Sequence, residues 1–96
     1  MDKKIVEYFK ILSDENRLEI VKLLLQGETY DCTLIDKVPI SQPTLSYHLK
    51  QLTNVGLAKA KREGNWIKHF IDREKLDEMI DYLIQLRDME AKQCNL

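Results

Sequence analysis

Segment 41–52 contains the side chains of this chain that are best suited to hydrogen bonding with another molecule. Leu45, Leu49 and Leu52 recur at i, i+4 and i+7, which predicts a helix with one buried stripe. The other faces are polar and free of acid, and they carry Gln42, Thr44, Ser46, Tyr47, His48, Lys50 and Gln51. Such side chains can pair with base edges in the major groove of DNA, where glutamine can bind adenine bidentately and Ser or Thr accept several bases. The candidate base contacts are therefore Gln42, Thr44, Ser46, Tyr47 and His48, with packing against the hairpin as the alternative for Tyr47 and His48.

Basic residues are concentrated around the same segment. Residues 41–71 have five Lys or Arg against one acid, a net charge of +4, whereas residues 1–40 (six against eight) carry −2 and residues 72–96 (four against seven) carry −3. A basic middle between acidic ends indicates an anionic partner for the middle of the chain. We expect phosphate contacts, which position a protein on DNA without reading its sequence, from Lys50, Lys61, Arg62 and Lys68.

Three further helices are expected before this segment. The first covers residues 3–12, and the second begins after Ser13 as its N-cap and ends near Gly27. The core-facing residues of these two helices are expected to be Ile5, Tyr8, Phe9 and Leu12, followed by Leu18, Val21, Leu24 and Leu25. A short helix over residues 31–38 would end at Pro39, and Ser41 would cap the polar helix, with Pro43 in its first turn.

A hairpin and a last helix complete the pattern. Residues 57–62 and 66–71 are expected to be strands, joined by the turn signal of Glu63, Gly64 and Asn65. Asn65 and Trp66 would lie at the tip and could touch the DNA backbone or minor groove, although Trp66 is better explained by packing. The last helix starts near Asp72. The expected fold is mainly α with a β-hairpin wing, in the order α-α-α-α-β-β-α.

These segments resemble the ArsR/SmtB family of bacterial winged-helix repressors over nearly the whole chain. The residues that carry the resemblance are Ile11 to Leu18, Ser41 to Leu52, Val55 to Leu57 and Arg62 to Trp66. The resemblance implies a homodimer that binds double-stranded operator DNA, represses transcription and is released by a ligand or redox signal. A constitutive repressor without an inducer site is the alternative.

A dimer is also favoured by the residue pattern. The first and last helices, residues 1–12 and 73–92, would each leave an apolar stripe uncovered in so small a domain, and twofold pairing would bury both stripes. A twofold dimer places two reading helices about 34 Å apart, which predicts a palindromic site. We also expect Ser41, at the start of the polar helix, to lie at the DNA surface with Gln42 and Thr44.

Cys32 and Cys94 are the two cysteines, and they leave the sensing question open. Relatives that sense arsenite or soft metals often carry Cys-x-Cys at the start of the third helix; here Cys32 matches the second cysteine and Tyr30 replaces the first. Arsenite or a soft-metal ion at Cys32 would need further ligands, from Cys94 or a partner subunit. A thiol switch between the two cysteines is another option, and a small buried Cys32 with a stray tail thiol is the third.

The remaining function classes are constrained by what the sequence contains. Ninety-six residues form one domain, no apolar run is long enough to span a membrane, and two cysteines are too few for a disulfide framework. We therefore expect a cytoplasmic protein without a membrane partner. The sequence contains no phosphate-binding glycine loop and no nucleophile with a base at useful spacing, which argues against an enzyme. A winged helix used only for protein interaction is the other alternative.

Overall fold

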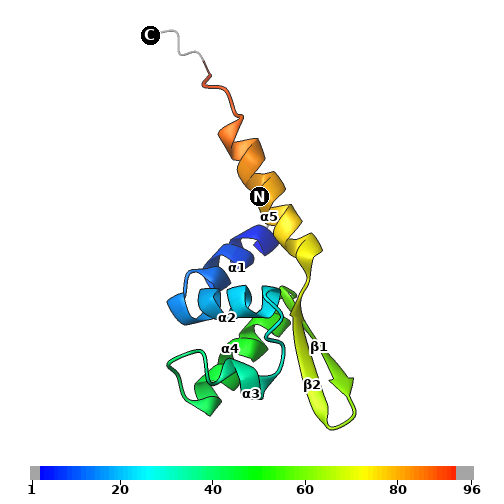
Figure 1. Cartoon of the computed structure of the whole chain (residues 1–96). Helices are drawn as coiled ribbons and strands as arrows, with labels where there is room; N and C mark the ends of the chain where they lie inside the picture. The colour runs from blue at the N-terminus through cyan, green and yellow to red at the C-terminus, as the bar shows by residue number, and fades with distance from the viewer. Residues whose placement is uncertain (1–2, 93–96) are drawn as a thin grey trace.

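A computed structural model describes residues 3–92. The elements follow one another as α1 (Lys3–Leu12), α2 (Glu15–Leu25), α3 (Asp31–Leu34), α4 (Gln42–Asn54), β1 (Ala58–Glu63), β2 (Trp66–Ile71) and α5 (Arg73–Arg87). This is the predicted mainly α order with a two-stranded wing, and Figure 1 shows the hairpin at one end of the molecule and α5 projecting at the other.

One apolar core holds α1, α2, α4 and the start of the wing together. Its fully buried side chains come from separate elements: Tyr8 from α1, Ile20 from α2, Leu34 from α3, Leu45 and Leu52 from α4, with Leu57 just before β1. The predicted α4 stripe of Leu45, Leu49 and Leu52 is buried as expected. The core therefore fixes the side of α4 that points inward and leaves the opposite side to solvent.

The wing is an antiparallel pair closed by a tight turn. Ala58 pairs with Ile71 and Glu63 with Trp66, so only Gly64 and Asn65 lie in the loop. Gly64 has φ +61°, the left-handed backbone that a type II′ hairpin needs at its first central residue. Glycine at this position allows the two strands to meet without strain.

Three details of the predicted helices were wrong. Asp14, not Ser13, caps α2: Asp14 Oδ2 accepts from the Arg17 backbone N–H, while the Ser13 hydroxyl donates to the Lys10 carbonyl. Both residue types cap helices, so the sequence left the start uncertain by one residue. Helix α3 ends at Leu34 rather than residue 38: residues 35–37 form a turn, and Pro39 disfavours helical backbone only at Val38.

The third error concerns Leu18, which was expected in the core and is 52% exposed. Ile20 and Leu23, which were not predicted, are buried instead. The α2 sequence is apolar on most of its circumference, so periodicity alone does not select the buried face.

Helix α5 is exposed along most of its length. Its last residue is Arg87, so the predicted dimerisation segment 73–92 is helical only in part. Ile80, Leu83, Ile84 and Leu86 are between 41% and 52% exposed on it. The radius of gyration is 16.7 Å, against about 13 Å for a compact chain of this length. The excess reflects the projection of α5 seen in Figure 1.

Candidate nucleic-acid interface

Helix α4 presents a polar face to solvent. Gln42, Ser46, Tyr47 and Lys50 are exposed on it, and Thr44 is half-buried. No residue of α4 is acidic, so nothing on the helix itself would repel a phosphate backbone. The exposed face has the dimensions and chemistry that a helix needs in a major groove.

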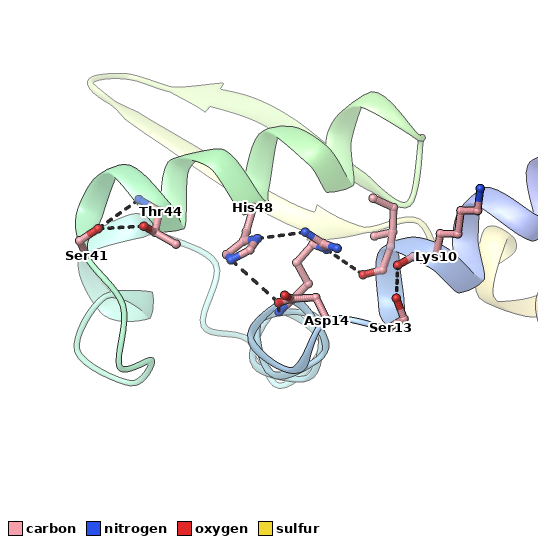
Figure 2. Close-up of polar contacts among 8 residues, drawn as sticks. Lys10, Ser13, Asp14, Ser41, Thr44 and His48 are labelled. Carbon is pink, nitrogen blue, oxygen red and sulfur yellow. Dashed lines mark hydrogen bonds and ion pairs between the residues drawn. The ribbon is translucent and has the colours of Figure 1, made fainter.

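The first turn of α4 is held by its own cap. Ser41 Oγ accepts from the Thr44 backbone N–H at 3.3 Å and donates to Thr44 Oγ1 at 2.9 Å, as Figure 2 shows. Pro43 lies in this turn, where a missing N–H costs nothing. Ser41 and Thr44 therefore fix the start of the helix, and both remain near the surface that was predicted to meet DNA.

The structure corrects the prediction that His48 contacts a base. It was placed among the base contacts, but it is 6% exposed and points toward α2. Arg17 Nη1 lies 3.3 Å from His48 Nδ1, and His48 Nε2 lies 3.9 Å from Asp14 Oδ2. A guanidinium can only donate, so Nδ1 is the acceptor and the ring hydrogen is on Nε2, facing Asp14. His48 thus packs α4 against α2 rather than reaching a base.

Arg17 and Asp14 complete this buried contact and were not predicted as functional residues. Arg17 Nε also donates to the Ile11 carbonyl at 2.8 Å, which connects the end of α1 to α4 through one side chain. The Arg17 backbone N–H is the main cause of a lowered pKa at Asp14; burial opposes it, and the charge of Arg17 adds to the lowering. The orientation of the polar helix is therefore set by a hydrogen-bonded link as well as by the apolar core.

The wing carries unbalanced positive charge. Lys61 and Lys68 are direct cross-strand partners in the hairpin register, and neither has an acidic partner at ion-pair distance within residues 3–92. Like charges directly opposite one another destabilise a strand pair. Arg62 and Asn65 are exposed beside them, and Arg62 Nε donates to the Gly64 carbonyl near the tip. Such an arrangement is stabilised when an anion lies between the lysines.

The loop before α3 fixes the wing in place. The Tyr30 hydroxyl donates to Glu63 Oε2 at 3.1 Å, a contact that raises the pKa of Tyr30, and its ring meets Trp66 edge-on at 6.1 Å. The His69 backbone N–H donates to the Thr29 carbonyl at 2.8 Å. Trp66 therefore packs against the loop, as expected, yet remains 59% exposed. Sequence analysis missed Tyr30 as a wing contact because its partners lie more than thirty residues away.

A groove of about 620 Å³ runs between α4 and the wing. It brings side chains of both elements to one face, including Gln42, Ser46, Lys50, Asn65, Trp66 and His69. Five of these six are polar or basic. Of the predicted base and phosphate contacts, Gln42, Ser46, Lys50 and Asn65 line this groove.

Cys32 does not have the surroundings of a metal site. It is exposed at the start of α3, against the expectation of a small buried hydrophobe, and Cys94 lies outside the described residues. Across residues 3–92, no three or more His, Cys, Asp or Glu side chains are grouped so that they could hold a metal ion. One thiol does not fit arsenite or zinc, which need three or four ligands.

The fold and the face just described define a winged helix-turn-helix DNA-binding protein. The family model for the bacterial regulatory protein, arsR family, matches residues 14–60, which span α2 to β1. An arsenical resistance operon repressor of Staphylococcus aureus is 40% identical over 81 residues, 84% of this chain and 78% of that repressor. An HTH-type transcriptional regulator of Methanocaldococcus jannaschii is 38% identical, over 88% of this chain and 96% of the regulator.

A solved structure gives the same result. An ArsR-like transcriptional regulator from Rhodococcus sp. RHA1 superposes with a TM-score of 0.81 at 25% identity, over 88% of this chain and 80% of that one. The chain belongs to the arsR family of bacterial regulatory proteins. The predicted winged helix-turn-helix fold and DNA-binding regulatory role are thereby confirmed over the alternatives of an enzyme and an interaction module. No helix within residues 3–92 is long and apolar enough to cross a lipid bilayer.

Proposed function

We propose that this chain is a homodimeric repressor that binds a palindromic operator, reading bases with α4 and gripping phosphates with the wing. The observation that carries the proposal is the cross-strand pair of Lys61 and Lys68, without acidic partners in the described residues, together with the acid-free exposed face of α4. Gln42, Ser46 and Tyr47 are the proposed base contacts, with Thr44 at their edge. Ser41, Lys50, Lys61, Arg62, Asn65 and Lys68 are the proposed backbone contacts.

The dimer is proposed from α1 and α5. Isoleucine and leucine side chains on α5 are about half exposed, and Val6 of the neighbouring helix α1 is 36% exposed. A second copy that covers these side chains would remove them from water, which is the usual reason for an exposed apolar stripe this size. Twofold symmetry would then direct two α4 helices to the same side of one duplex.

Release of the operator by a ligand or redox signal remains a prediction. The relatives include arsenical resistance repressors and cadmium resistance regulators, but the described residues of this chain offer one exposed thiol and no multi-ligand site. Cys32 with Cys94, or with a partner's residues, remains the candidate. A repressor inside the cytoplasm, where its operator lies, is the setting we infer.

The phosphate contacts can be tested by salt dependence. Fluorescence anisotropy of a labelled duplex at several salt concentrations gives a log–log slope of about −0.9 for each phosphate neutralised. Removing both Lys61 and Arg62 (K61A/R62A) should flatten that slope by about 0.9 for each phosphate that is no longer neutralised, and should weaken binding to every sequence alike. Lys92→Ala removes a positive charge far along the chain from the wing and serves as the control. An unchanged slope in the double variant would disprove the phosphate role of the wing.

A further inference from the structure

The side chain of Gln42 is already engaged within the protein. Its Nε2 lies 3.4 Å from Asp31 Oδ2, at the start of α3, and 3.5 Å from Ser46 Oγ, one turn further along α4. A reversed amide would turn its oxygen toward a carboxylate, where two acceptors repel. The charge of Asp31 therefore selects the orientation with nitrogen inward.

This orientation determines which hydrogen bonds Gln42 can still make. A glutamine side chain has two N–H donors and one carbonyl oxygen that accepts. Asp31 and Ser46 take up the two donors, so the free capacity is the acceptor, Oε1. Gln42 in this state cannot bind adenine bidentately, because that pairing needs a donor for N7 as well as an acceptor for the amino group.

Asp31 is itself fixed by the wing. His69 Nε2, on β2, lies 3.0 Å from Asp31 Oδ1, and the His69 side chain is only 12% exposed. The two atoms are close, but Oδ1 makes no aligned hydrogen bond within the described residues. A ring nitrogen that faces a carboxylate at this distance carries the hydrogen. One carboxylate thus faces His69 with one oxygen and Gln42 with the other.

We propose that Asp31 is a specificity-determining positioning residue, which holds the Gln42 amide so that its oxygen meets the DNA and selects a base with a major-groove amino group. Those bases are adenine and cytosine, whose N6 and N4 groups donate; guanine and thymine present carbonyl acceptors at the corresponding edge. The proposal rests on the base-reading role of α4 given above. It adds a residue outside α4 to the determinants of the operator sequence.

The test is selection of bound duplexes from a random-sequence pool by the full-length chain, followed by sequencing. Gln42→Ala first identifies the base position that Gln42 reads, because preference is lost there alone. In the unsubstituted chain, adenine plus cytosine should exceed guanine plus thymine at this position by about fivefold or more.

Asp31→Asn gives the sharpest outcome. The Asn oxygen remains opposite His69, so its NH₂ group faces Gln42 and turns the Gln42 oxygen inward. The outward amide nitrogen should then favour guanine or thymine, and the preference at this position should reverse. Asp31→Ala removes the acceptor that holds the Gln42 amide, so the amide can turn and bind adenine bidentately. The base preference should then narrow to adenine. This second variant keeps the proposal testable if Asp31→Asn folds poorly. Melting followed by circular dichroism confirms folding of each variant.

Asp36→Asn is the matched control. Asp36 is an exposed acid shortly after α3, so its replacement removes the same charge and should strengthen binding to all DNA without changing any base preference. If the unsubstituted chain selects a palindrome but Asp31→Asn leaves the preference at the Gln42 position unchanged, the role of Asp31 is disproved and base reading by α4 stands. If no sequence is enriched by any variant, base reading by α4 fails, and this proposal fails with it.

Discussion

Replacing Leu83 by alanine should weaken the proposed dimer and leave the protomer fold intact. Leu83 is 50% exposed in the protomer and lies between Ile80 and Ile84 on the uncovered face of α5. Complete burial of a leucine side chain is worth about 1.5–3 kcal/mol, so covering the exposed half would contribute about 0.8–1.5 kcal/mol. A twofold dimer contains two copies, giving about 1.5–3 kcal/mol in total. The dimer dissociation constant should therefore rise about 10- to 150-fold.

Sedimentation equilibrium over a range of protein concentrations measures that constant directly. Gln85→Ala is the control, because Gln85 is exposed on the opposite side of α5 from Leu83 and its removal should leave association unchanged. Circular dichroism establishes that the helix content of both variants is the same. A Leu83→Ala chain that associates as tightly as the original, or an original chain that stays monomeric while it binds operator DNA, would refute pairing through α5.

Three further outcomes are expected. Asp14→Ala should lower the free energy of unfolding by about 1 kcal/mol through loss of the α2 cap. Because the folded pKa of Asp14 is lowered, this stabilisation is present above the unfolded value near 3.8 and is lost as pH falls through the folded pKa. The stabilities measured by urea titration at pH 7 and pH 3 should therefore differ less in the variant than in the original chain. His48→Ala should destabilise the fold by about 1–3 kcal/mol, since it leaves the Arg17 guanidinium short of a partner; unaltered stability with lost base preference would instead make His48 a DNA contact. Cys32→Ser should leave operator affinity unchanged without added metal or oxidant, and a release by arsenite that persists in this variant, measured by anisotropy, would exclude Cys32 from sensing.

The elements were predictable because each has a local signal. Ser41 and Asp72 cap their helices through their own side chains, and Gly64 marks the turn that joins the strands. The polar side of α4 followed from the leucine stripe on its other side. All of these inferences use residues within a few positions of one another, where spacing and chemistry are enough.

The errors and omissions involve partners distant in the sequence. His48 is buried because Arg17 and Asp14 approach from a helix about thirty residues earlier, and no local pattern separates that histidine from an exposed one. The same applies to Asp31, whose contacts with Gln42 and His69 depend on how α3 packs between α4 and β2. Leu18 shows the complementary problem, since apolar residues are spread around most of α2 and periodicity alone does not select its buried face.

Arg17 has a mechanical consequence for the spacing of operator half-sites. Its guanidinium joins the last turn of α1, through the Ile11 carbonyl, to the middle of α4, through His48. In the proposed dimer, with α1 at the twofold axis, this hydrogen-bonded link would connect the dimer contact to α4 and help to set the separation of the two α4 helices. Inserting one base pair at the centre of an operator moves the half-sites about 3.4 Å apart and rotates them by about 34°, since one turn takes about 10.5 base pairs. A dimer linked in this way would adjust the distance between its two α4 helices only slightly. The spacing of the half-sites should therefore matter for binding as much as their sequence.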